Sequence, residues 1–580
     1  MKEKLKFGSK IANLVVSWFN VFMFFAMRCC WSGISKTLQY EEVESIVGKW
    51  FILNLPPILW FIFIGLFIAN IVLFILKDKK DYKWSYIFNG VNGLFFIVIL
   101  VVIMLGAIDY MDYIWPPFFG YLGISLLVLL GVFFIFFYPK TPLHNKKYFK
   151  FSALGIILLV LIIHLFNISF NKITCGATVY AVENEYQIVF SSSTEARAWV
   201  TLDGNEDYRY FDDYNGANRT YTKIHKVHVP MTDLNEAKGY TIHVQKLTYR
   251  GPFGGYFGRE ITESYEFRPV DMSDGVLDYY SLSDIHMASK ASVKTVSHFD
   301  NIELLVVAGD IVSMMDSFAD ANLTNEISHK ITNGEYPVIY ARGNHEIKGK
   351  YAEEFHQFVG THNGNFFFNV YLDNTFVTVL DIGEDHDDDY WEYYDTAFYE
   401  IYRDKQVKML ESVLEEGKHL DYEYKMAVCH IPVVYVNARK NHTKIKAQLT
   451  DLLNKLDINM CISGHQHDLL VFEPGTVTPN EKPYYNSSYK PDKKFGGYLT
   501  DFKFVNLGVS KRGYEQFDDS TLTKTKSQIG VYIKVELNKN IQTVQFTNSK
   551  GEAVDVINFF ADISYGDTLV FSLEDNKIVK

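Results

Sequence analysis

Cysteine is scarce in this sequence. Only five occur in 580 residues, at positions 29, 30, 175, 429 and 461. Their spacing is neither that of a disulfide framework nor that of a paired thiolate metal site. A disulfide-stabilised secreted scaffold and a cysteine-ligated metal site are therefore excluded.

Basic residues are outnumbered after residue 174, where the chain holds 40 Lys and Arg against 60 Asp and Glu. Residues 1–174 carry a net charge of +8 and the remaining residues carry −20, which together give the −12 of the whole chain. Non-specific nucleic-acid binding requires Lys and Arg to neutralise phosphates. A nucleic-acid partner is therefore not expected, and an extracellular nuclease is disfavoured.

Charged residues are almost absent from four long apolar runs, at 51–76, 86–108, 117–138 and 151–170. Each run is long enough to cross a bilayer, which takes about 20 residues. A fifth run, 11–31, is less apolar and could be a span, an interfacial helix or a signal peptide. Small residues are missing where a signal peptidase would need them, which disfavours the signal peptide.

The charges between these runs favour five spans over four. Residues 77–85 and 139–150 hold four lysines each, whereas residues 109–116 hold neither Lys nor Arg. By the positive-inside rule the lysine-rich loops and the basic N-terminus are cytoplasmic, which requires residues 11–31 to cross. We therefore predict a multi-pass plasma-membrane protein whose transmembrane region is 1–174 and whose remaining residues are extracytoplasmic.

Short alternating strands follow this region. Patterns of apolar and polar residues recur at 186–190, 196–202, 223–229, 240–247 and 265–270, separated by turn residues. Several short strands at this spacing predict an antiparallel β-sandwich over residues 175–270.

Polar residues then follow five apolar strands, which are expected at 279–282, 304–308, 337–340, 426–429 and 458–462. In an open α/β sheet, ligands collect at the carboxyl ends of the strands. The motifs at these ends are Asp284-x-His286, Gly309-Asp310, Gly343-Asn344-His345-Glu346, His430 and Gly464-His465-x-His467.

Two carboxylates, neutral imidazoles and an amide are suitable ligands for two divalent cations. They would leave a net charge of about +2, which can hold a hydroxide and a phosphate dianion. Two metal ions ~3.5–4 Å apart can activate a water and stabilise an in-line displacement at phosphorus. Oxygen and nitrogen ligands suit Mn, Fe, Zn or Co, and the residues do not choose between them.

This set of motifs resembles the calcineurin-like metallophosphoesterase superfamily. The resemblance implies a four-layer α/β sandwich, placed at residues 275–560 with a C-terminal tail at 561–580. It also implies hydrolysis of a phosphate mono- or diester by a metal-bound hydroxide. By motif, one metal is assigned to Asp284, His286 and His467 and the other to Asn344, His430 and His465, with Asp310 as the bridge and His345 as general acid or transition-state stabiliser. An orienting role for Glu346 is implied only by analogy with the superfamily.

Two features separate the chain from the purple acid phosphatases, although the sandwich at 175–270 resembles the fibronectin-type domain that precedes their catalytic domain. Those enzymes bind ferric iron through a Tyr three residues after the bridging Asp, where this chain has Ser313. They also lack the His of Asp-x-His, which is present here as His286. We therefore expect the general metallophosphoesterase site, without a tyrosinate ligand.

An acidic and aromatic segment, residues 383–391, follows the apolar strand 376–380. It resembles a Gly-Glu-Asp segment of some members of the superfamily. It could be a lid that disfavours polyanions and prefers small or cation-bearing phosphoesters. A solvated acidic loop or a structural cation site explains the composition equally well.

The sequence thus predicts an α-helical transmembrane bundle, then a β-sandwich, then an α/β metallophosphoesterase domain with two divalent metal ions. The expected partners are the membrane and a phosphoester, either a small molecule or a lipid or cell-surface group. The alternative is a membrane sensor or transporter whose outer domain binds a phosphorylated ligand without turnover.

Overall fold

The computed structural model describes residues 171–250, 255–384, 386, 388–433, 440–465, 467, 469–474, 501–506, 528–558 and 563–579, together with Trp18, Ile64, Gly65 and Ile68. The chain divides into two units. Unit 1 comprises Met1–Phe170 and Lys246–Arg259, and nearly all of it lies outside the described residues. Unit 2, which comprises Asn171–Gln245 and Glu260–Lys580, contains every candidate site residue.

A large sheet of twelve strands forms one half of the fold. Its strands are β1 (Ile173–Val182), β2 (Glu185–Leu202), β3 (Asn205–Phe211), β6 (Thr222–Pro230), β7 (Gly239–Arg250), β8 (Gly255–Glu266), β9 (Val276–Leu282), β10 (Leu304–Val307), β11 (Val338–Tyr340), β18 (Ile529–Glu536), β19 (Ile541–Asn548) and β22 (Thr568–Ser572). The order is β22-β19-β18-β9-β10-β11-β1-β2-β7-β8, with β3 and β6 also paired to β2. Strands β9, β10 and β11 are parallel, so their carboxyl ends meet at one edge.

A smaller sheet of six strands forms the other half. Its strands are β12 (Phe368–Leu372), β13 (Thr375–Leu380), β14 (Tyr424–Cys429), β15 (Met460–Ser463), β16 (Leu470–Phe472) and β17 (Lys503–Asn506), in the order β12-β13-β14-β15-β17-β16. Two short hairpins pair β4 (Asp213–Tyr214) with β5 (Ala217–Asn218) and β20 (Val556–Asn558) with β21 (Ile563–Gly566).

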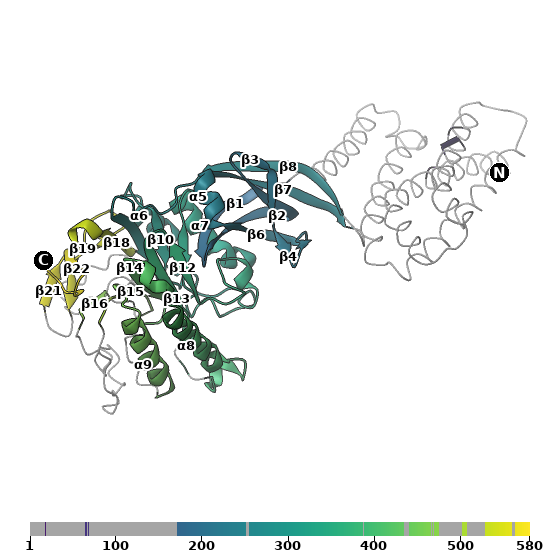
Figure 1. The fold of residues 1–580 in the computed structure, drawn as a ribbon. Coiled ribbons are helices and arrows are strands. Elements are labelled where there is room, and N and C mark those ends of the chain that lie inside the picture. The colour runs from purple at the N-terminus through teal and green to yellow at the C-terminus, as the bar shows by residue number, and fades with distance from the viewer. Residues whose placement is uncertain are drawn as a thin grey trace, which may run out of the picture. The chain divides into compact units, whose positions relative to one another are not determined.

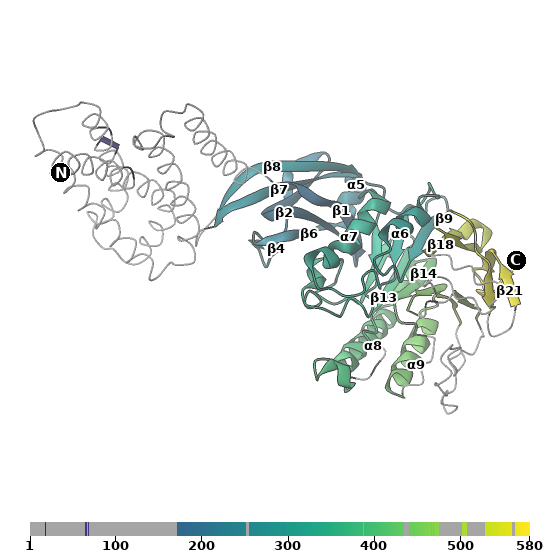
Figure 2. The ribbon, with the colours of Figure 1, turned by 180° about the vertical axis from the view of Figure 1, so that it is seen from behind.

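Five α-helices lie within the described residues: α5 (Met231–Ala237), α6 (Ser289–Val296), α7 (Phe318–Thr332), α8 (Tyr399–Glu416) and α9 (Lys440–Lys455). The same residues contain four short 3-10 helices: η1 (Phe355–Gln357), η2 (Trp391–Tyr393), η3 (Lys418–Asp421) and η4 (Leu537–Lys539). Figures 1 and 2 show α6 and α7 beside the large sheet and α8 and α9 beside the small sheet.

Alternation along the strands separates two apolar cores. In β14, Met426 and Val428 belong to the core that also contains β9, β10 and β11. The residues between them, Ala427 and Cys429, belong to a second core with α8 and α9. Because neighbouring residues of a strand face opposite sides, the small sheet packs on the large sheet with one face and on two helices with the other. The result is the layered α/β fold expected for the phosphoesterase domain.

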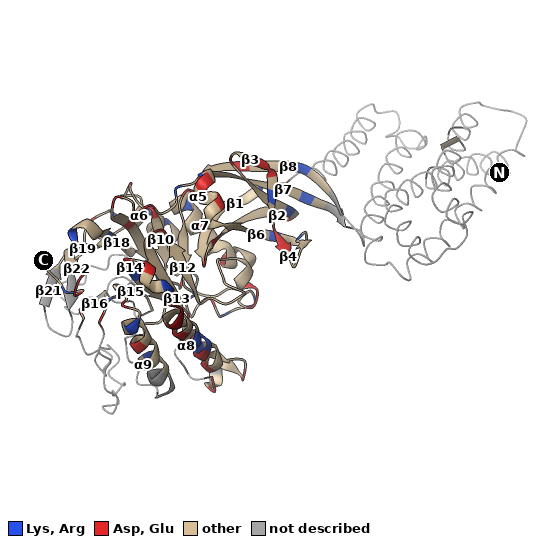
Figure 3. Cartoon of the chain, viewed as in Figure 1, with Lys and Arg blue, Asp and Glu red and all other residues tan. Residues whose placement is uncertain are grey.

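The fold class predicted from the sequence is wrong in its first part, the α-helical transmembrane bundle. Within the described part of the chain, no helix combines the length and the hydrophobicity that a membrane span needs. The longest, α8, has 18 residues and carries charges of both signs along its length (Figure 3). Apart from Trp18, Ile64, Gly65 and Ile68, the five predicted spans lie outside the described residues. The prediction rested on run length and apolar composition, which give the solvent preference of a segment but not its fold.

The predicted separate β-sandwich also differs from the structure. The strands predicted at 186–190 and 196–202 form one strand, β2, and those at 223–229 and 240–247 lie within β6 and β7, whereas the strand predicted at 265–270 is wrong because β8 ends at Glu266. Strand β1 pairs in parallel with β11, through Tyr180 and Val338, and so extends the large sheet. An alternating pattern shows that one strand face is buried, but it does not show which sheet the strand joins. No local signal indicates a pairing over more than 150 residues.

Candidate metal centre

The predicted site residues all follow strand ends, as expected, and the structure brings them together. Asp284 and His286 follow β9, Asp310 follows β10, and Asn344 and His345 follow β11, all from the large sheet. His430 follows β14, and His465 and His467 follow β15, all from the small sheet. The site is therefore built where the ends of parallel strands from both sheets converge.

The backbone at this convergence is strained. Five candidate ligands have positive φ angles, a conformation that side chains other than glycine rarely adopt: Asp284 at 53°, His286 at 43°, Asp310 at 53°, His465 at 74° and His467 at 56°. Such residues cost about 1–3 kcal/mol each and gather at functional sites. Asp and His tolerate this conformation better than most residues do.

The open cluster consists of Asp284, His286, Asp310 and His467. Each residue offers one ligand atom, and these atoms lie within 4.8 Å of one another. His467 Nε2 is 3.1 Å from Asp284 Oδ1 and 3.2 Å from His286 Nε2. The Asp284 side chain is fully buried, whereas that of His467 is 37% exposed, so this cluster is reached from solvent.

The closed cluster consists of Asp310, Asn344, His430 and His465. His430 Nε2 lies 3.1 Å from Asp310 Oδ2, and His465 Nδ1 lies 3.2 Å from Asn344 Oδ1. The His430 side chain is only 1% exposed, and its Nδ1 donates to the Ala308 carbonyl at 2.7 Å. This bond fixes the tautomer that leaves Nε2 free to bind a metal.

Asp310 belongs to both clusters through a single oxygen. Its Oδ1 accepts a hydrogen bond from the His345 backbone N–H at 3.0 Å. Its Oδ2 is 3.1 Å from His430 Nε2 and 3.8 Å from His286 Nε2. One carboxylate oxygen thus faces ligands of both clusters, as a bridging ligand would.

The donor atoms fit divalent metal ions. Two ligand atoms at right angles on one ion, each about 2.1 Å from it, are roughly 3 Å apart. Four donor pairs in the two clusters are separated by 3.1–3.2 Å. In addition, the buried His430 Nε2 has no hydrogen-bond partner of good geometry. A metal ion would satisfy this atom and relieve the close approach of the donors.

The pKa values differ between the clusters. Burial lowers the pKa of His286 to about 4, so its imidazole is neutral at pH 7 and keeps a lone pair for a metal. Burial also opposes charge on His430, but the facing Asp310 carboxylate outweighs it and raises the pKa of His430 to about 10. A metal ion binding to the closed cluster must therefore displace a proton.

His345 lies at the rim of both clusters. Its Nδ1 donates to the Ser313 carbonyl at 2.8 Å, and its Nε2 lies 3.8 Å from Asp310 Oδ2. The imidazole is 32% exposed and packs edge to face on His286, with 4.7 Å between the ring centroids. Its Nε2 can therefore exchange a proton with a group that lies over the metal site.

Three supporting residues received no firm role from the sequence. The buried Glu346 carboxylate accepts from four backbone N–H groups, those of Asp310, Ile311, Val312 and Gly343, and so ties two ligand loops together. Burial and the nearby Asp310 charge raise the pKa of Glu346 to about 7.

The other two supporting residues bond directly to predicted ligands. Ser283 Oγ donates to Asp284 Oδ2 at 2.7 Å. Glu384 accepts from the amide of Asn344. The sequence indicates Glu346 by its position beside His345 and Glu384 by its place in the acidic segment 383–391, whereas it assigns no role to Ser283.

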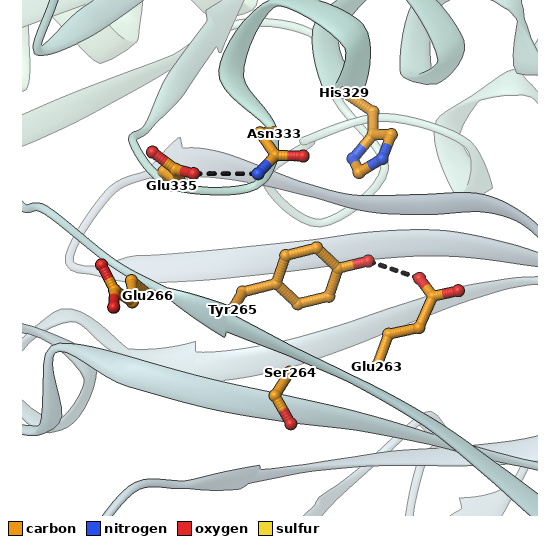
Figure 4. A pocket seen from close by; sticks show the side chains of 7 residues that line it. All are labelled: Glu263, Ser264, Tyr265, Glu266, His329, Asn333 and Glu335. Atoms are coloured by element: carbon orange, nitrogen blue, oxygen red, sulfur yellow. Dashed lines mark hydrogen bonds between the residues drawn. The ribbon is translucent and has the colours of Figure 1, made fainter.

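A separate cavity of about 480 Å³ is lined by Glu263, Ser264, Tyr265, Glu266, His329, Asn333 and Glu335. Figure 4 shows Tyr265 in this pocket with its hydroxyl bonded to Glu263, and Asn333 bonded to Glu335. None of the candidate ligands lines it. Its residues belong to β8, the end of α7 and the turn that leads into β11, so the pocket is not part of the metal centre.

Residues 280–469 match the model of the Calcineurin-like phosphoesterase family. This part of the chain is similar to a calcineurin-like phosphoesterase domain. The match begins within β9 and ends just after His467, so it includes His345 and every residue of the two clusters. The prediction that the chain is a phosphoester hydrolase is confirmed, and the clustered His and Asp side chains support a metal-dependent one.

Several solved structures are distantly similar to this phosphoesterase. The purple acid phosphatase PPD1 from yellow lupin (Lupinus luteus) seeds has 12% identity and a TM-score of 0.44, covering 68% of this chain and 74% of its own. GAP50 of Plasmodium has 12% identity and a TM-score of 0.29, covering 50% and 88%. TT1561 of Thermus thermophilus has 11% identity and a TM-score of 0.28, covering 47% and 99%. No curated protein matches the chain.

The assignment of individual residues to individual metal ions stays a prediction. All eight predicted site residues are within or beside the two clusters, and Asp310 is shared between them. Asn344 enters the closed cluster through its contact with His465.

Proposed function

We propose that this protein hydrolyses a phosphate mono- or diester at a dinuclear centre formed by the open and closed clusters. The observation that carries the proposal is the sharing of Asp310 Oδ2 between two groups of imidazole and carboxylate ligands. Two divalent ions, which the donors suit as Mn, Fe, Zn or a similar metal, would supply Lewis acidity and a nucleophilic water.

His345 has the geometry of a general acid. Because its Nδ1 donates to the Ser313 carbonyl, the second proton of the imidazolium is on Nε2, which faces the clusters. This proton can pass to the oxygen of the leaving group as the phosphorus–oxygen bond breaks. A positioned general acid contributes typically ~10²–10⁴-fold to the rate.

We also propose that the phosphoesterase acts outside the cytoplasm, at the cell membrane, on a small-molecule phosphoester or on a lipid or cell-surface phosphoester. The support is compositional: residues 1–174 carry +8 and long apolar runs, whereas the rest of the chain carries −20. Fractionation of cells followed by protease digestion tests this location. Recovery of the enzyme in the soluble cytoplasmic fraction would contradict it.

A panel of phosphomonoesters and phosphodiesters, assayed with purified full-length protein under Mn, Fe and Zn, tests the reaction. We expect metal-dependent release of phosphate or of the leaving group, and a loss of at least ~100-fold in the Asn344→Ala variant. Equal rates in the wild type and Asn344→Ala would overturn the proposal. Binding of phosphoesters without turnover would instead support a sensor.

The role of His345 is tested by the leaving group. With p-nitrophenyl phosphate, whose leaving group needs little protonation, His345→Ala should lose activity only modestly. With an alkyl phosphate, the loss should reach ~10²–10⁴-fold, because the alkoxide needs a proton. Equal losses on both substrates would assign His345 to charge stabilisation rather than to proton transfer.

A further inference from the structure

The loop after β13, residues 381–384, supplies none of the predicted metal ligands, yet it contacts the loop that supplies Asn344. Asn344 Nδ2 donates to Glu384 Oε2 at 3.3 Å. The other oxygen of this carboxylate, Oε1, lies 2.9 Å from Lys348 Nζ. Glu384 is buried, with 4% of its surface exposed. Both of its oxygens therefore face donors from the same loop.

The orientation of the Asn344 amide decides whether Asn344 can bind a metal. Its oxygen can donate a lone pair to a cation, whereas its NH₂ group presents hydrogens and cannot. A carboxylate only accepts hydrogen bonds, so the NH₂ group must face Glu384 and the oxygen must face His465. The opposite orientation would place the amide oxygen against a carboxylate oxygen.

Helix α8 holds Glu384 in place from behind. The buried Arg403 donates through Nε to the Ile382 carbonyl and through Nη2 to the Glu384 carbonyl, both at 2.8 Å. Gln406 makes two further bonds to Asp381, one to its backbone N–H and one to its carbonyl. The backbone that carries the Glu384 carboxylate is thus fixed independently of the metal site.

We propose that Glu384 is a positioning residue for the closed cluster, where it orients the Asn344 amide with its oxygen toward the metal ion. The inference rests on the proposed function, since it requires this cluster to hold a metal. It also gives the acidic segment that follows β13 a defined role at its first carboxylate.

The competing explanation is that Glu384 only forms a structural ion pair with Lys348. A glutamine at position 384 distinguishes this ion pair from the orientation of the Asn344 amide. Asn344 and Lys348 face different oxygens of the Glu384 carboxylate. A glutamine in the same place presents an oxygen to one of these donors and an NH₂ group to the other, so it can accept from only one of them. Because hydrogen bonds from a charged donor are the stronger ones, the glutamine oxygen should face the Lys348 ammonium, and its NH₂ group should face the Asn344 amide. Removing the lysine with Lys348→Met frees the glutamine oxygen for Asn344, so the double variant should recover what Glu384→Gln loses.

Titration of the metal-free full-length protein with Mn²⁺, with free Mn²⁺ followed by electron paramagnetic resonance, tests the proposal through stoichiometry and affinity. We expect two Mn²⁺ per wild-type chain. In Glu384→Ala and Glu384→Gln, one site should keep its affinity and the other should weaken ~10–100-fold, as for losses of other groups that orient a ligand. The double variant Glu384→Gln/Lys348→Met should return close to the wild-type affinity.

Two controls accompany these variants. Glu423 accepts from the amide of Asn374 at 3.0 Å, an equivalent contact made at the other end of β13 and β14. Both Glu423→Ala and Lys348→Met should bind Mn²⁺ as the wild type does.

Wild-type affinity at both sites in Glu384→Ala or in Glu384→Gln would overturn the inference. A double variant as weak as Glu384→Gln would also overturn it, in favour of the ion pair. A wild-type protein that binds fewer than two Mn²⁺ would contradict the proposed dinuclear function itself. If Glu384→Ala does not fold, the glutamine variants still decide.

Discussion

The open and closed clusters share Asp310 but differ in how the fold holds them. In the closed cluster His430 is 1% exposed and bonded to the Ala308 carbonyl, and the Asn344 amide is oriented by Glu384. In the open cluster His467 is 37% exposed. Groups that are buried and bonded on their far side are prearranged for a metal, whereas exposed groups lose conformational freedom when they bind one. We therefore expect a tightly held ion in the closed cluster and an exchangeable ion in the open cluster.

The comparison between the open and closed clusters depends most on Asp310, which belongs to both. Because one carboxylate oxygen faces both clusters, Asp310→Ala should weaken both metal sites together and lower kcat/KM by about 10³-fold or more, equivalent to several kcal/mol of lost transition-state stabilisation. Metal content and kcat/KM measured on the same preparation check this. If Asp310→Ala retains two metal ions and the wild-type rate of hydrolysis, Asp310 is not the bridging ligand.

Removal of one histidine from each cluster should affect stability unequally. His430→Ala leaves the buried Asp310 charge without its imidazole partner and should cost about 3 kcal/mol in the metal-free protein. His467→Ala should cost less than about 1 kcal/mol, because Asp284 keeps its bonds from Ser283 and the His465 backbone. Urea denaturation in the presence of a chelator measures both. Equal losses would show that the two clusters are held alike.

The two clusters should also respond to pH in different windows. His430 has a pKa raised to about 10, so its pairing with Asp310 stabilises the metal-free fold fully below pH 6.5 and is lost as the pH rises through 10. His286 has a pKa lowered to about 4, so the fold gains stability as the pH rises from 4 to 6.5. Compared with the wild type, His430→Ala should lack the alkaline decline in Tm, and His286→Ala should lack the acid-side rise. Unchanged Tm profiles would contradict these pKa values.

The smallest expected effect concerns the rates at which the two clusters release their metal ions. Chelator added to the loaded enzyme should remove one ion in a fast phase and the other in a slow phase, with Glu384→Gln accelerating only the slow phase. Metal analysis at successive times measures this. A single phase for both ions would mean that the difference in burial has no bearing on metal exchange.

Much of the site could be predicted from the sequence because each ligand follows a strand with a strong local signal. The expected strands at 279–282, 304–308 and 337–340 agree within a few residues with β9, β10 and β11. A buried apolar run predicts a β-strand, and the Gly-Asp or Gly-Asn that follows it predicts the position of the metal ligand.

Other features depend on contacts that no local pattern encodes. The joining of β1 to β11 and the contact of Asn344 with Glu384 link residues that are far apart in the chain. The strained φ angles at Asp310 and His465 follow from the convergence of two sheets. The fold class was wrong where it relied on apolar runs alone, since composition does not specify the packing of a segment.

The central claim is that two metal ions, bridged by Asp310, are needed for phosphoester hydrolysis. The most direct test is the rate of hydrolysis as a function of Mn²⁺ bound per chain, measured on the substrate that the panel identifies. We expect little activity with one ion bound and full activity only as the second, open site fills. Full activity with one ion per chain, or activity in Asp310→Ala that follows the wild-type curve, would contradict the claim.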